Sequence, residues 1–265
     1  MRLRVRSSWA FWVVITLQPA ARAEPPVPSA RAVAPTCAET TLAHLSAELE
    51  RAESRNTARR DRELIEGSDE GGDVGPHLSV FADCLLRRRD PGFDQARKVG
   101  YAALEARIAR IFKGRSDARL LLASGLAYLT EISGSIASDV DVLGDIPFVN
   151  ALLRRSAEIA PDLDGARALI TLGAIECMRP PLVGGQPRAG MSQLERAAQV
   201  TERANLSVQL TMAEFCAVTL NDRELFESLL RELLEAPPAA RFARANACAK
   251  RRASYLLEHA NAIFP

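Results

Sequence analysis

Two adjoining segments near the C-terminus limit the folds that are open to this chain. Residues 208–220 are almost entirely apolar, whereas the segment that follows mixes apolar and charged positions. Its apolar residues recur with a period close to 3.6 and form one broad stripe, made of Leu225, Phe226, Leu229, Leu230, Leu233 and Leu234. We therefore expect a buried inner helix followed by an outer helix with one solvated side, which is the building unit of helical arrays.

The ends of the outer helix are marked by residues that start or stop helices. Asn221 is a favourable N-cap, and Glu224 three residues later makes a variant capping box with it. Pro237 and Pro238 end the helix because proline lacks the backbone N–H that a helix interior needs. The sequence therefore predicts one helix that begins at Asn221 and runs to residue 236.

Earlier segments repeat this arrangement in a degenerate form. Tetratricopeptide (TPR) repeats carry a Leu-Gly pair in the first helix, small and large apolar residues in the second and a closing proline. Leu172-Gly173 supplies the first feature, Gly190 and Leu194 match the second helix, and Pro237 closes the next unit. Aromatic residues make up only 5% of the chain, and no alternating β-branched run argues for a sheet. The predicted fold class is all-α, a TPR-like array or superhelix of helical hairpins with cryptic repeats.

The same spacing predicts helices along the rest of the chain. The expected helical segments are 40–65, 77–89, 93–112, 116–137, 147–160, 164–178, 189–204, 206–220, 221–236 and 242–264. An acidic, glycine-rich stretch at 67–75 is expected to be a disordered loop. We divide the chain into an N-terminal helical region, 37–115, which contains this loop, and a TPR-like helical domain, 116–265.

The first residues have the features of a secretory signal peptide. Three arginines precede an apolar run at 9–17, and Ala21-Arg22-Ala23 is a small-x-small cleavage site. The apolar run is shorter than the roughly 20 residues that span a bilayer. We predict a signal peptide at 1–23, a flexible Pro/Ala-rich leader at 24–36, and a periplasmic or exported protein that is soluble after cleavage near Ala23.

The charge of the remaining chain argues against a nucleic-acid partner. Four of the 34 basic residues and none of the 33 acidic residues lie in the first 23 positions, which leaves 30 basic and 33 acidic side chains, a formal net charge of −3. Nucleic-acid and anionic-membrane surfaces need a basic excess, and here the two signs are evenly mixed.

No motif in the sequence supports catalysis. His44, His77 and His259 lie in three different predicted helices and lack the spacing of metal ligands. We find no phosphate-binding glycine loop with its lysine, no nucleophile elbow and no zinc-protease motif. Gly184-Gly185 is interpreted as a turn. The sequence predicts a protein that is not an enzyme and that uses no metal or other cofactor.

Three carboxylates stand alone within otherwise uncharged stretches of predicted helix: Glu131, Glu176 and Glu214. One alternative is that each pairs with an arginine or lies at a solvated helix seam, because an unpaired buried charge is costly. The other is that they line a channel or a ligand pocket, where burial would raise the pKa of the carboxyl group. The three residues are therefore the candidates for ligand binding or pore lining.

Cysteine usage leaves two alternatives. An exported chain with five cysteines has at least one without a partner, and the five are Cys37, Cys84, Cys177, Cys216 and Cys248. Cys177 and Cys216 lie one repeat apart, so a bridge between neighbouring inner helices is one alternative. Helix axes pack about 8–10 Å apart and bridged Cα atoms lie within about 7 Å, so only directly facing positions can form it. The sequence favours buried free thiols that pack as small apolar residues.

Five segments that occur in a fixed order resemble one known family. They are Phe148–Leu153, Pro161–Gly165, Pro181–Gly185, Asn221–Phe226 and Asn246–Ala253. Together they resemble the T component (TatT-like) of tripartite ATP-independent periplasmic (TRAP) transporters, a TPR-like family, over about residues 115 to 265. The resemblance implies an all-helical periplasmic accessory protein that works with a solute-binding (P component) protein. It also implies a homo-oligomer perforated by a pore and a small hydrophobic or organic-acid ligand.

The partner-contacting loop, the membrane anchor and the function are each considered in the light of this resemblance. Pro181, Gly184 and Gly185 are the candidates for a loop that contacts the partner. Members of the family are commonly lipoproteins with a cysteine directly after the cleavage point, whereas the first cysteine here is Cys37, well beyond Ala23. Lipid anchoring is therefore not expected. Two functions stay open: an accessory protein of solute uptake, and a general periplasmic scaffold for protein–protein interactions in envelope assembly.

Overall fold

Helices form all the regular structure in the residues that the computed structural model describes, which are 40–66, 78–135, 140–179 and 185–264. No strand occurs in these ranges, so the predicted all-α class is confirmed. The predicted signal peptide, leader and acidic loop all lie outside the described residues.

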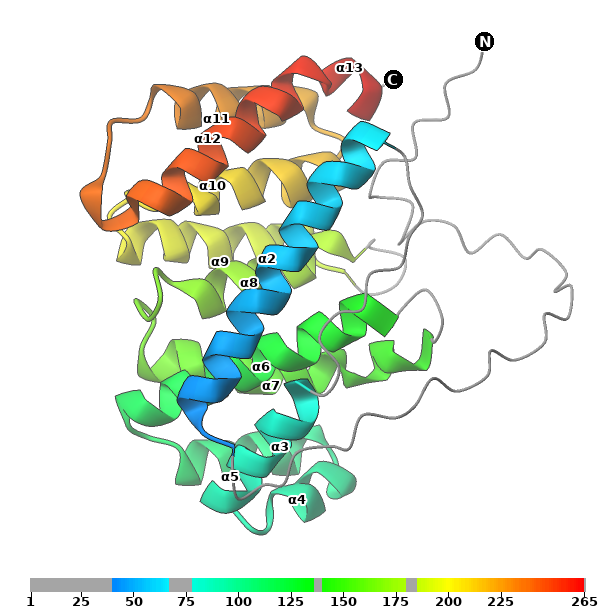
Figure 1. Ribbon diagram of the computed structural model, residues 1–265, viewed down its shortest axis with the longest axis vertical. Helices are drawn as coiled ribbons and strands as arrows, with labels where there is room; N and C mark the ends of the chain where they lie inside the picture. The colour runs from blue at the N-terminus through cyan, green and yellow to red at the C-terminus, as the bar shows by residue number, and fades with distance from the viewer. Residues whose placement is uncertain (1–39, 67–77, 136–139, 180–184, 265) are drawn as a thin grey trace, which may run out of the picture.

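Four helices come first along the chain (Figure 1): α2 (Leu42–Glu66), α3 (Leu78–Arg89), α4 (Phe93–Val99) and α5 (Tyr101–Ile111). The remaining helices follow as successive pairs: α6 (Arg115–Ser135) with α7 (Ile146–Ile159), α8 (Arg167–Met178) with α9 (Pro187–Val200), α10 (Ser207–Thr211) with α11 (Arg223–Glu235), and α12 (Ala243–Glu258) with α13 (Ala260–Ile263). A π-helical turn, Met212–Ala217, continues α10, and short 3-10 helices at Val140–Asp145 and Ala240–Phe242 precede α7 and α12.

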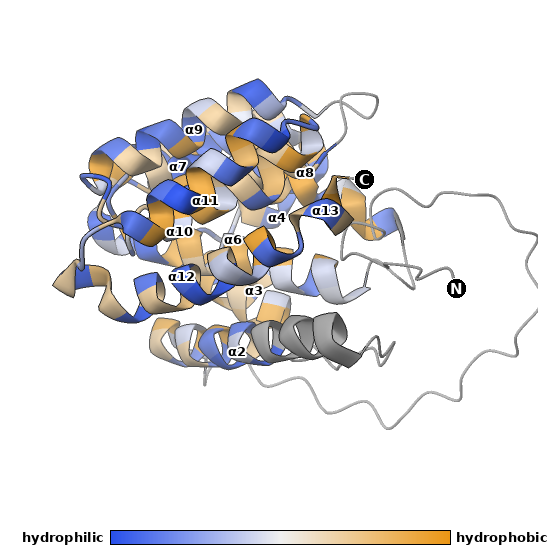
Figure 2. Ribbon diagram, turned by 90° about the horizontal axis from the view of Figure 1, so that it is seen from above, coloured by the Kyte–Doolittle hydropathy of each residue, from blue (hydrophilic) through white to orange (hydrophobic). Residues whose placement is uncertain are grey.

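The paired helices form two layers, and α2 crosses one of them. In the view from above, α6, α8 and α10 each lie nearer to α2 than their partners α7, α9 and α11 do (Figure 2). We call α6, α8, α10 and α12 the inner helices. α2 runs diagonally over them in Figure 1. A buried inner layer and a half-solvated outer layer are what the apolar and amphipathic patterns predict.

Glycines allow the inner and outer helices of a pair to approach closely. A Cβ atom on Gly190 of α9 would lie 2.7 Å from the carbonyl oxygen of Gly173 in α8, and a Cβ on Gly173 would lie 2.6 Å from Leu194 Cγ. No larger residue fits at either position without moving the backbone. These glycines are the ones that the TPR template singled out, although the TPR character of the repeat itself stays a prediction.

Asparagines link the start of α10 to the start of α8, and α12 to the start of α10. Asn205, just before α10, donates from its side chain to the carbonyl of Gly165, just before α8, at 2.8 Å. Asn246 of α12 donates to the carbonyl of Ala204 at 2.9 Å and accepts from the N–H of Leu206 at 3.0 Å. The sequence separations in these bonds are 40 to 42 residues, which is longer than the 34-residue TPR period.

Two apolar clusters hold the layers together. The larger runs without a break from Leu45 in α2 to Cys216 in the π-helical turn, so the N-terminal helices share a core with the later ones. The smaller cluster joins α10 to α13 and includes the edge-to-face pair Phe226 and Phe264. The predicted division at residue 116 is not tested by this packing and stays a prediction.

Several boundaries differ from the prediction. The expected helix at 242–264 is two helices, α12 and α13, because the chain leaves the helical conformation at His259. The expected helix at 93–112 is two helices, because Gly100 has a φ of 138° that ends α4. Asp222, not Asn221, caps α11 by accepting from the N–H of Leu225 at 2.9 Å. Asn221 instead has a left-handed φ of 54°, which turns the chain between the two helices. The expected helix at 164–178 begins only at Arg167, after left-handed residues at 164–166.

Candidate functional site

The inner helices present a row of half-buried side chains toward α2. Arg167 forms an ion pair with Glu53 of α2. Ile170, Ala174 and Met178 follow Arg167 at helical spacing and are also partly exposed. This side of α8 therefore faces α2 and combines one cation with apolar surface, and we call it the inner face.

Glu214 lies in the π-helical turn that continues α10. Its Oε1 accepts two hydrogen bonds from the Arg252 guanidinium of α12, from Nε at 3.2 Å and from Nη2 at 2.5 Å. Arg252 also lies over the Tyr255 ring, 5.5 Å from its centroid. The carboxylate thus has an arginine partner, as in the first of the two alternatives. A further role in ligand binding stays a prediction.

Glu131 caps a helix from a distant part of the chain. Its Oε1 accepts the backbone N–H of Ser79, in the first turn of α3, at 2.7 Å. A carboxylate at a helix N-terminus satisfies a free donor and interacts favourably with the helix dipole. Glu131 therefore holds α3 against α6.

Glu176 lies away from the inner face. It follows Arg167 by nine residues, about two and a half turns at 3.6 residues per turn, so it projects from the opposite side of α8. Its carboxylate pairs with Arg179 at 2.6 Å. The structure therefore does not gather Glu131, Glu176 and Glu214 into one site, and their role in lining a pore stays a prediction.

The loop candidates are only partly described. Pro181 and Gly184 lie outside the described residues. Gly185 is buried, and a Cβ atom there would overlap the carbonyl group of Arg179. Gly185 is thus required for the close return of the chain before α9, and its contact with a partner stays a prediction.

The expectation of free thiols in the inner helices is wrong. Cys177 and Cys216 form a disulfide with a Cα–Cα distance of 4.8 Å, and both residues are fully buried. The bridge forms because α8 and the π-helical turn meet at directly facing positions, which spacing along one helix does not reveal. Cys84 is also disulfide-bonded. Cys248 is free and exposed, and Cys37 lies outside the described residues.

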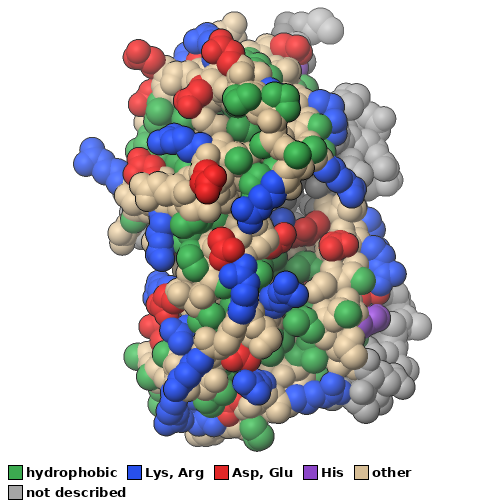
Figure 3. All heavy atoms as spheres, turned by 90° about the vertical axis from the view of Figure 1, so that its left-hand side faces the viewer, with side chains coloured by type: hydrophobic (Ala, Val, Ile, Leu, Met, Phe, Trp, Pro, Cys, Tyr) green, Lys and Arg blue, Asp and Glu red, His purple; other side chains and the backbone are tan. Residues whose placement is uncertain are grey.

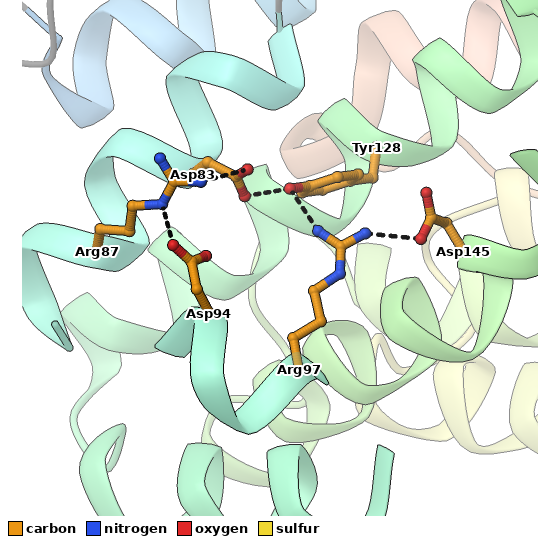
Figure 4. Close-up of polar contacts among 6 residues, drawn as sticks. All are labelled: Asp83, Arg87, Asp94, Arg97, Tyr128 and Asp145. Atoms are coloured by element: carbon orange, nitrogen blue, oxygen red, sulfur yellow. Dashed lines mark hydrogen bonds and ion pairs between the residues drawn. The ribbon is translucent and has the colours of Figure 1, made fainter. Parts of the chain in front are cut away.

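A polar network that sequence reasoning missed joins α3, α4, α6 and the turn before α7 (Figure 4). The Tyr128 hydroxyl donates to the Asp83 carboxylate and accepts from Arg97 Nη1 at 3.3 Å. Arg97 Nη2 donates to Asp145 at 2.6 Å, and its guanidinium lies 4.1 Å from the centroid of the Phe148 ring. The network continues on α3, where Arg87 pairs with Asp94 at 2.7 Å.

Burial dominates the electrostatics of this network. Desolvation raises the pKa of the Asp83 carboxyl, and the hydrogen bond from Tyr128 partly opposes that rise. Desolvation and the neighbouring Asp83 charge also raise the pKa of Tyr128, which therefore stays a hydroxyl donor. Asp83 has a raised pKa, a hydrogen bond from Tyr128 of α6 and the charge of Arg97 of α4 nearby, and is therefore a candidate for a functional group or for a pH-sensitive contact between helices.

Replacing Tyr128 with phenylalanine is expected to destabilise the protein by about 1–3 kcal/mol at pH 7, because the half-buried Asp83 carboxylate loses a donor. The pKa of Asp83 should rise further. A carboxyl with a raised pKa in the folded state binds its proton more tightly there, so the loss should shrink as pH falls through that pKa. Urea unfolding from pH 7 to pH 4 measures both effects.

The matched control for this variant is Tyr101→Phe. The Tyr101 hydroxyl donates to the carbonyl of Gly144 at 2.8 Å on an exposed part of the surface. Its loss should cost little at any pH, because water replaces the bond. A Tyr128→Phe variant that matches this control across the pH range would show that Asp83 does not depend on Tyr128.

One cavity among the described residues is small and partly enclosed. A cavity of about 40 Å³ lies between α9, α10 and α11, lined by Ala198, Arg203, Asn205, Val208, Gln209, Met212, Leu229 and Glu232. It is far below the roughly 300–1,000 Å³ of small-molecule pockets and can hold water. Within the described ranges, no group of three or more His, Cys, Asp or Glu side chains is placed to hold a metal ion. None of the helices searched there is long and apolar enough to cross a membrane.

Comparison with known proteins gives one positive result. A family model described as the TRAP transporter T-component matches residues 80–264. This range is well over half of the chain, and it begins within α3, earlier than the motifs that carry the resemblance in the sequence. No individual curated protein matches the chain.

Proposed function

Because the chain belongs to the TRAP transporter T-component family, we propose that it is a non-enzymatic periplasmic accessory protein of a TRAP-type solute uptake system. In this role it binds the solute-binding (P component) protein of that system through its helical surface. The family match over residues 80–264 is the observation that carries the proposal. The layered helices support it, because arrays of this kind work by offering an extended surface to other molecules.

The inner face is the proposed place for a small ligand. Ile170 and Met178 supply partly exposed apolar surface beside the Arg167–Glu53 ion pair, and Glu214 with Arg252 supplies a second charged pair on the neighbouring helices. Apolar surface with a few charged groups suits a hydrophobic molecule that carries a carboxylate. A homo-oligomer with a pore belongs to the same proposal and rests on the family alone.

Co-purification tests the partner. The full-length protein, expressed with the solute-binding protein and the permease of a TRAP system from the same organism, is expected to retain the solute-binding protein on an affinity column at low salt. A separate solute-binding protein from another uptake system serves as the control and should not be retained. Recovery of envelope-assembly proteins in place of the solute-binding protein would contradict the proposal and favour the scaffold role.

A further inference from the structure

The last inner helix, α12, has one side that no other described helix covers. Its buried residues are Asn246, Ala249, Ala253 and Leu256, which pack toward α10 and α11. Residues on the other side, from Arg244 to Glu258, are exposed at helical spacing. In a stack of helix pairs, the side of a helix that no neighbouring helix covers is free to meet another molecule.

Arginines occupy this uncovered side. Arg244 and Arg251 are seven residues apart and therefore lie on the same side of α12, and Arg241 lies just before the helix, in the 3-10 helix Ala240–Phe242. All three are exposed. We call this surface, with the small residues Ala247, Cys248 and Ser254 between and after the arginines, the basic face of α12.

The charges of the basic face are not used inside the protein. Within the described residues, no carboxylate forms an ion pair with Arg244 or Arg251; the Arg251 guanidinium reaches only Cys248 Sγ, at 3.2 Å. Arg241 lies over the Phe242 ring, and its charge helps to lower the pKa of Asp162, whose carboxylate is bonded twice by Arg115. Glu258 is the acidic residue on the same side, two turns beyond Arg251.

Other basic residues of α12 serve the fold. Lys250 donates to the carbonyls of Leu234 and Ala236 at 2.9 and 2.7 Å and so caps the end of α11. Arg252 pairs with Glu214. Lys250 and Arg252 thus have partners inside the protein, whereas the guanidinium groups of Arg244 and Arg251 are available to another molecule.

The basic face also differs from its surroundings. On the face drawn in Figure 3, acidic and basic side chains are intermixed. On α11, the exposed Arg223 and Arg231 both pair with Glu227, and the helix also carries exposed Glu224, Glu232 and Glu235, so the two signs are mixed. An excess of one sign, here three arginines against Glu258, directs the approach of a partner with the opposite sign.

We propose that the basic face of α12 is the docking surface for an acidic patch on the solute-binding protein. This inference rests on the proposed function and names the surface that carries it out. The small side chains let a partner approach the helix closely, and the guanidinium groups present planar donors that match carboxylates in pairs. Three basic residues on one short stretch bind an anionic membrane only weakly by themselves, so a protein with matching carboxylates is the better fit.

Charge reversal tests the docking surface. The double variant Arg244→Glu/Arg251→Glu is expected to bind the solute-binding protein at least tenfold more weakly than the wild type in titration calorimetry at 50 mM NaCl. Wild-type affinity should fall as salt rises to 500 mM, because exposed charges are screened. The variant should lose most of that salt dependence. Circular dichroism and melting temperature verify that the variant is folded.

The matched control is Arg188→Glu/Arg196→Glu on α9. Both residues are exposed and lie in the outer layer, so the change in net charge is the same at a different place. If both double variants bound the solute-binding protein with wild-type affinity, this inference would be overturned and the proposed function would stand. A wild type that binds no solute-binding protein would overturn both. The α12 variant could instead lose binding to anionic phosphatidylglycerol vesicles, which the wild type and the control bind, while its affinity for the solute-binding protein is unchanged. That result would assign the face to a membrane and overturn the inference.

Discussion

Removal of the Cys177–Cys216 disulfide should destabilise the protein by about 4 kcal/mol. The bridge closes a segment of the chain with a sequence separation of 39, and the loop-entropy relation gives about that value for such a length. It also joins α8 to the π-helical turn. Without the bridge, the chain connects these two inner elements only through α9 and α10. The measurement is urea unfolding of the Cys177→Ala/Cys216→Ala variant. Alanine avoids placing a hydroxyl group in a fully buried site.

The control for this variant is Cys248→Ala. Cys248 is exposed and unbridged, so its replacement should change the free energy of unfolding by no more than about 0.5 kcal/mol. A double variant that unfolds at the same urea concentration as this control would contradict the expected contribution of the bridge. Because Gly190 packs against Cys177 Sγ, the alanine variant should also loosen the α8–α9 contact.

The bridge illustrates what helical spacing can and cannot predict. The stripe from Leu225 to Leu234 identified α11 correctly, because amphipathic periodicity is a property of one helix. The facing of Cys177 and Cys216 depends on how two helices are rotated and shifted against each other. That relation is set by close-packed residues such as Gly173 and Gly190, and no local pattern encodes it.

The isolated carboxylates show the same division. Their positions in inner helices could be predicted, because each lies in an uncharged stretch. Their partners could not: Ser79 is 52 residues from Glu131 and Arg252 is 38 from Glu214. Arg179, three residues from Glu176, was the one partner within reach of a local argument.

The network around Tyr128 could not be predicted from the sequence for a similar reason. Asp83 and Arg97 lie 45 and 31 residues from Tyr128, and neither belongs to a motif. Because the helical pattern breaks at Gly100, Arg97 lies in a separate short helix, α4. Gly100, within an otherwise regular helical pattern, was the local signal of that break. The prediction of a single helix at 93–112 did not take it into account.

Phe148 is the residue on which this junction depends most, and Phe148→Ala should destabilise the protein by about 4 kcal/mol. The side chain is fully buried, and its ring packs edge-on to the Tyr128 ring and against the Phe93 ring. The distances between ring centroids are 4.7 Å and 5.8 Å, respectively. Loss of a buried phenylalanine removes apolar burial and leaves a cavity, at a typical cost of about 3–5 kcal/mol. Arg97 also loses the ring over which its guanidinium lies. Urea unfolding of the purified variant measures the change.

Two further variants separate packing at Phe148 from general sensitivity to mutation. Phe148→Leu keeps most of the volume and should cost only about 1–1.5 kcal/mol. Val99→Ala truncates an exposed apolar side chain at the end of α4 and should cost about 0.5 kcal/mol or less. If Phe148→Ala were no more damaging than Val99→Ala, α4 would not be packed on α6 and α7 through this ring. The network of Figure 4 would then lack the support that keeps Arg97 between Tyr128 and Asp145.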